Sequence, residues 1–142
     1  MQITQIIIRI VIAVYLIIMG VIDIRKQQIP LLPGLICLGV ATASLLVAGI
    51  GILEIAAGVL VGGLLLIVSR VSRGGVGEAD ALVYAVTGTT LGFFGNCEVL
   101  LISLMMAAIV GSVLMIAKHV GRKYRLPFVP FTLIAYGMVV CL

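Results

Sequence analysis

Two aspartates are the strongest candidates for chemistry in a sequence with only five acidic residues. Asp23 ends one long apolar segment and Asp80 begins another. An ionisable residue at the edge of such a segment is costly, so it is a functional-site candidate by default. Two carboxylates in a site of low polarity share one proton, and this pair can activate a water and protonate a leaving amine. The structural alternative is that each aspartate pairs with a nearby arginine, Asp23 with Arg25 and Asp80 with Arg73.

The sequence around each aspartate favours the chemical interpretation. A glycine-rich run, residues 74–77, precedes Asp80 and allows backbone shapes that are closed to other residues. It would let an extended substrate backbone lie close to the acid. Asp23 is followed seven positions later by Pro30, which suits the restart of a helix. We therefore expect a short, ordered connection after Asp23.

The composition shows what kind of element must carry these acids. Of 142 residues, 63% are hydrophobic and 10% are charged, whereas soluble domains have about 25% charged residues. We therefore expect the protein to be surrounded by lipid. This composition excludes a disordered chain, a disulfide scaffold and a nucleic-acid-binding domain. The three cysteines are far apart and match no metal spacing, so we expect no metal and no cofactor. They are Cys37, Cys97 and Cys141.

The apolar segments predict an all-α, polytopic membrane helix bundle of about six transmembrane helices. A bilayer crossing needs roughly 20 mostly apolar residues, and helices satisfy their backbone hydrogen bonds internally in lipid. We expect one transmembrane domain over residues 1–142. The six candidate segments are Ile3–Ile22, Pro30–Ile50, Ile52–Ser69, Ala81–Gly95, Val99–Ala117 and Pro127–Leu142.

Charge placement predicts the topology of this bundle. Eight of the nine basic residues fall in three alternate connections, and the positive-inside bias makes these connections cytoplasmic. Both termini are then extracytoplasmic, Glu54 and residues 96–98 mark outer turns, and both aspartates lie at the cytoplasmic face. The eight residues are Arg25, Lys26, Arg70, Arg73, Lys118, Arg122, Lys123 and Arg125.

Small residues in the third and fourth segments predict close helix packing. Gly58 and Gly62 form one GxxxG pair, and Gly88 and Gly92 form another. Such pairs allow helix backbones to approach each other in a membrane.

Three motifs in order resemble those of the type IV prepilin peptidases, which are GxGD-type aspartic membrane peptidases. The motifs are Asp23 with the following Ile-Pro at residues 29–30, the Gly-Glu-Ala-Asp run at residues 77–80, and Pro-Phe-Val-Pro-Phe at residues 127–131. The chain departs from the family pattern at Ala79, where Gly is usual, and at Leu31, where Asn is usual. A rival register over residues 75–78 would put Glu78 in the acid position, but Asp80 is preferred because it begins the apolar run.

The resemblance implies an aspartic endopeptidase that cuts the basic leader from prepilins or pseudopilins at the cytoplasmic face of the inner membrane. Asp23 and Asp80 would be catalytic, and Glu78, Gly75 and Gly77 would contact the substrate. The chain would be a short form, because it lacks the cysteine-rich domain associated with methyl transfer. Lipid and the precursor are the expected partners, and a preflagellin substrate stays open. The alternatives are a small proton-coupled transporter or channel, or a membrane subunit without activity.

Overall fold

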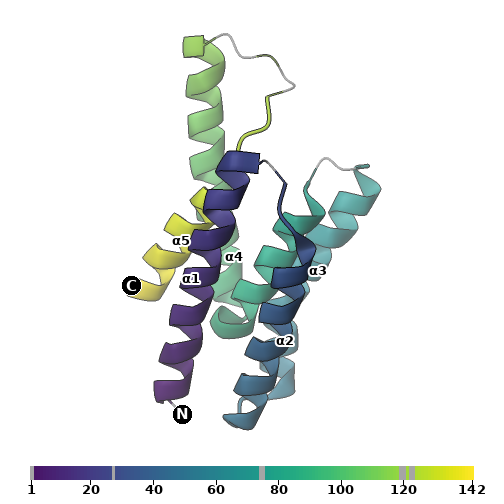
Figure 1. The fold of residues 1–142 in the computed structure, drawn as a ribbon, viewed down its shortest axis with the longest axis vertical. Coiled ribbons are helices and arrows are strands. Elements are labelled where there is room, and N and C mark those ends of the chain that lie inside the picture. Colours follow the sequence, from purple (N-terminus) through teal and green to yellow (C-terminus); the bar gives the residue numbers. More distant parts are fainter. Residues whose placement is uncertain (1, 27, 74–75, 119–120, 122–123) are drawn as a thin grey trace.

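The computed structural model describes residues 2–26, 28–73, 76–118, 121 and 124–142. Helices make up 87% of this part of the chain, and no strand occurs in it. An all-helical fold is therefore confirmed (Figure 1). The helices are α1 (Gln2–Lys26), α2 (Leu31–Val47), α3 (Ile52–Val71), α4 (Glu78–Lys118) and α5 (Val129–Cys141).

Helix α4 is not straight but folds back on itself at Gly92. This residue has φ 68° and ψ −172°, in a region that favours glycine. The hydroxyl of Thr87 donates to Oδ1 of Asn96 at 2.8 Å, although nine positions of straight helix would separate them by about 13 Å. The stretches 78–91 and 93–118 are therefore antiparallel, and we call them the first and second limbs of α4.

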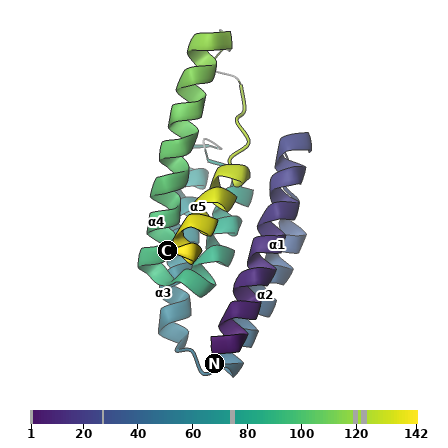
Figure 2. The same ribbon diagram turned by 90° about the vertical axis from the view of Figure 1, so that its left-hand side faces the viewer.

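With this reversal, six helical stretches alternate in direction along the chain. Figure 1 shows α1, α3 and the second limb of α4 rising, and α2, the first limb and α5 descending. The ends of α1 and α3 and the beginning of α4 thus lie toward the same end of the bundle. Figure 2 shows α5 between α1 and α4. This arrangement brings the two aspartate-bearing helix ends together.

The contact between α3 and the first limb of α4 depends on glycine, as the sequence predicts for three of the four positions. Gly58 and Gly88 meet backbone to backbone, and a methyl group on Gly62 would lie 2.6 Å from the carbonyl oxygen of Ala81. Such close approach leaves no space for a side chain. The prediction is wrong for Gly92, which forms the turn and has open space around it.

A second correction concerns the outer turn expected at residues 96–98. The chain reverses four residues earlier, and Asn96 is fully buried in the second limb. Its amide donates to the carbonyl oxygens of Tyr84 at 2.7 Å and Gly58 at 3.1 Å. A buried amide needs hydrogen-bond partners. The polar side chain of Asn96, which suggested a loop, therefore joins α3 to both limbs of α4 instead.

Apolar side chains fill the interior and also cover the outside. Ile12, Leu16, Tyr84 and Tyr136 are at most 2% exposed and pack in one cluster. Helices α1, α3 and α4 are long and apolar enough to cross a membrane, whereas α2 and α5 are shorter apolar helices. The exposed apolar surface fits a protein surrounded by lipid.

Candidate active site

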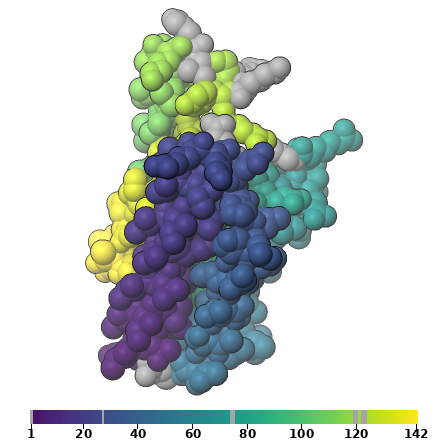
Figure 3. Space-filling view, in the orientation of Figure 1, coloured from purple at the N-terminus to yellow at the C-terminus, as the bar shows by residue number. Residues whose placement is uncertain are grey.

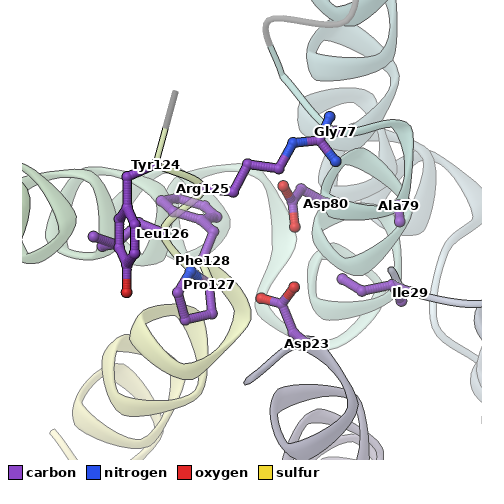
Figure 4. Close-up of a pocket in the computed structure, with 10 residues that line it drawn as sticks. All are labelled: Asp23, Ile29, Gly77, Ala79, Asp80, Tyr124, Arg125, Leu126, Pro127 and Phe128. Carbon is purple, nitrogen blue, oxygen red and sulfur yellow. The ribbon is translucent and has the colours of Figure 1, made fainter. Parts of the chain in front are cut away.

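Asp23 and Asp80, which the sequence predicts to lie at the same face of the bundle, line one cavity. The cavity has a volume of about 340 Å³ and lies where the end of α1, the beginning of α4 and the beginning of α5 meet. Figure 4 shows the two carboxyl groups facing each other across it. The lining residues are Asp23, Ile29, Gly77, Ala79, Asp80, Tyr124, Arg125, Leu126, Pro127 and Phe128.

Asp23 belongs to the last turn of α1 and is 8% exposed. Its Oδ2 atom accepts a hydrogen bond of 3.2 Å from the backbone N–H of Val129, the first residue of α5. The first N–H groups of a helix have no partner within it, and the helix beginning carries partial positive charge. The carboxylate of Asp23 therefore lies at the beginning of α5, where a backbone donor of that helix is available to it.

Asp80 lies in the first turn of α4 and is half-buried. Its amide donates to the carbonyl oxygen of Gly77 at 3.1 Å, which closes the first turn of this helix. A methyl group on Gly77 would lie 2.8 Å from Oδ2 of Asp80. Among the described glycines only Gly49 and Gly92 have positive φ, so Gly77 provides space rather than an unusual backbone shape.

Glu78 does not line the cavity that Asp23 and Asp80 share. Its Oε1 atom pairs with Nε of Arg70 at 2.9 Å, and both side chains are largely exposed. Glu78 and Arg70 border a neighbouring cavity of about 400 Å³ instead. The register that places Asp80 in the acid position is therefore the one that brings two carboxyl groups together. Gly75, the remaining substrate-contact candidate, lies outside the described residues.

The structural alternative for the aspartates requires arginine partners. Within the part of the chain that the structure describes, Asp23 forms no ion pair with Arg25, and Asp80 forms none with Arg73. The same part contains no group of three His, Cys, Asp or Glu side chains that would hold a metal.

Sequence reasoning missed two contributors to the site. Arg125 was assigned to topology, but it lines the cavity and extends toward Asp80 and Gly77 in Figure 4. Its place two residues before the motif at residues 127–131 was the available signal. The amide of Val129 was also missed, and it leaves no signal because every residue except proline carries one.

Asp80 also borders a second cavity, of about 390 Å³, on the side of α3 and the second limb of α4. Its other walls are mainly apolar and include Leu65, Leu100 and Leu104. The hydroxyl of Tyr84, one helical turn after Asp80, is bonded to Ser103 and to Thr132. Asp80 therefore lies between the cavity that it shares with Asp23, which we call the acid cavity, and a buried, hydrogen-bonded part of the bundle.

Comparison with known proteins gives one match. The model of the type IV leader peptidase family matches residues 10–116, three quarters of the chain. This range includes both aspartates and the Gly-Glu-Ala-Asp run at residues 77–80, whereas the motif at residues 127–131 lies beyond it. No curated protein and no solved structure gives a significant match.

Proposed function

The chain belongs to the type IV leader peptidase family, and we propose that it is a membrane-embedded aspartic endopeptidase. Its substrates would be type IV prepilins or pseudopilins, from which it removes the short basic leader. The observation that carries this proposal is the meeting of Asp23 and Asp80 in one cavity. Family membership alone supports a leader peptidase, and the paired carboxyl groups support the proposal that its mechanism is that of an aspartic peptidase.

The different surroundings of the two acids support different roles in hydrolysis. Asp23, which accepts the Val129 N–H, suits the ionised base that removes a proton from a water. The water oxygen then bonds to the carbon of the scissile carbonyl. Asp80 suits the protonated partner, which polarises this carbonyl and gives its proton to the leaving amine as the C–N bond breaks. The proton that Asp23 took from the water then passes to Asp80, which restores the starting state of the pair.

The proposed topology has six membrane crossings in one peptidase domain, with both termini outside the cytoplasm. The reversal at Gly92 supports it, because it divides the chain into six alternating helical stretches. The described basic residues lie in the last turns of α1, α3 and α4 or shortly after them, and thus at alternate connections, as the positive-inside bias predicts for cytoplasmic loops. Arg122 and Lys123 lie outside the described residues. The acid cavity would then open toward the cytoplasm, and the protein would be located in the inner membrane.

Glu78 is proposed to contact the basic leader. Its present partner, Arg70, is 71% exposed, and an exposed ion pair contributes only about 0–1 kcal/mol. A lysine or arginine of the leader can therefore compete for this carboxylate at little cost. Gly77 would contribute by keeping the space beside Asp80 open to the substrate backbone.

The direct test is cleavage of a candidate prepilin by the purified protein in detergent or vesicles. Asp23→Asn and Asp80→Asn should each lower the rate by about 10²–10⁴-fold or more, because each removes a proton-transfer group. Both variants should fold normally, since asparagine has nearly the size of aspartate, and at position 23 its amide oxygen can still accept the Val129 hydrogen bond. Glu98→Gln, at the opposite end of the bundle, is the matched control and should cleave normally. Full activity in either aspartate variant would refute the assignment.

A further inference from the structure

A long apolar groove runs between α1 and α2, outside the acid cavity. Its volume is about 740 Å³, within the usual range of ligand sites of ~300–1,000 Å³. Its lining extends from Ile7 to Ile22 on α1, about 22 Å of helix, and from Leu32 to Ser44 on α2, about 18 Å. Figure 3 shows the two helices side by side along this face. The groove is therefore long enough to accompany an apolar helix through most of a bilayer.

One end of the groove adjoins the acid cavity. Ile22, which lines the groove, is next in the chain to Asp23, which lines the cavity. On the other wall, Leu32 follows Ile29 by three positions, and Ile29 also borders the cavity. A chain that lies in the groove and continues past its end therefore arrives at the two carboxyl groups.

Tyr15 lines this groove, but its hydroxyl does not face it. The side chain is 8% exposed, and the hydroxyl is fully buried beside Gly34, 2.8 Å from where a methyl group on that glycine would be. Gly34 does not line the groove. The surface that the groove presents to an occupant is therefore almost entirely apolar.

We propose that the groove between α1 and α2 holds the apolar segment of the precursor while its scissile bond lies at Asp23 and Asp80. This inference rests on the proposed function, which supplies an occupant with a basic leader followed by an apolar helix. The described lining contains no charged residue, which matches such a segment. Close side-chain packing, rather than exclusion of water, would hold the two helices together in lipid.

Site-specific photo-crosslinking tests the location. The photoreactive residue benzoylphenylalanine replaces Ile36 or Val40 on the groove wall of α2, in an Asp80→Asn background that cannot consume the precursor. The matched controls carry it at Leu60 or Leu64 of α3, which are 54% and 50% exposed and line none of the cavities described above. After illumination in vesicles with a prepilin, the groove positions should form a precursor adduct at least about tenfold more abundant than the controls.

The outcomes separate the groove from the proposed function. Cleavage by the unsubstituted protein, together with adducts at Ile36 or Val40, supports both proposals. Cleavage with adducts only at the controls, only to lipid, or only to a second copy of the chain overturns the groove and leaves the function standing. Absence of cleavage overturns the proposed function, and the groove assignment fails with it.

Discussion

Gly77 is the residue whose substitution tests the geometry of the acid pair most directly. In Gly77→Ala the added methyl group would lie 2.8 Å from Oδ2 and 3.4 Å from Cγ of Asp80. Restoring an ordinary contact of 3.4 Å moves the carboxylate oxygen by about 0.6 Å. Because the oxygen is the end of a rotatable side chain, the fold should absorb this shift at little cost. Catalysis should not, since a 1 Å misplacement of reacting groups costs about 10²-fold.

We therefore expect Gly77→Ala to lower kcat for prepilin cleavage by about tenfold to hundredfold, with a thermal midpoint close to that of the unsubstituted protein. The assay is the time course of product formation on a gel under saturating precursor. Gly63→Ala is the matched control, because nothing lies within 4 Å of its methyl position. Wild-type kcat in Gly77→Ala would refute the reasoning, since it would show that the present position of the Asp80 carboxylate is not the one used in catalysis.

Two further substitutions test packing and leader recognition. Gly58→Ala places a methyl group against the backbone of Gly88, so it should destabilise the protein by about 1–3 kcal/mol, measured as a lower thermal midpoint in detergent than that of Gly63→Ala. Glu78→Arg should slow cleavage of precursors with basic leaders by about threefold to tenfold, through the loss of one attractive charge and the gain of a repulsive one. Glu98→Arg, at the other end of the bundle, is the control and should not slow cleavage. If Glu78→Arg cleaved precursors with basic leaders as fast as the parent protein does, Glu78 would have no role in leader binding.

The helical class and the shared end of the bundle for the two acids could be predicted from the sequence because both depend on strong, local signals. Whether the two carboxyl groups meet in one cavity could not, because that depends on how the helices pack. Long apolar runs with few charges leave few options besides helices in lipid. Alternating basic connections then place Asp23 and Asp80 at one face without any knowledge of packing. Chain direction alone is enough to bring these two acids to the same end of the bundle.

The turn at Gly92 and the role of Asn96 were not predictable for a physical reason. A glycine in an apolar run can serve helix packing or a left-handed turn, and both uses give the same sequence pattern. An asparagine likewise suits a loop or a buried network. Only the positions of the partners, the carbonyl oxygens of Gly58 and Tyr84, distinguish these cases.

The two acids are held by parts of the bundle that differ in construction. Asp80 belongs to the limb that packs backbone to backbone on α3 and is tied to it through Asn96. Asp23 belongs to α1, where the Val129 amide holds its carboxylate. Helix α1 also forms one wall of the apolar groove. A precursor that lies in the groove would therefore contact the helix that carries Asp23, whereas Asp80 belongs to the tightly packed side. Binding of the precursor and the position of Asp23, the proposed base, would then both depend on α1.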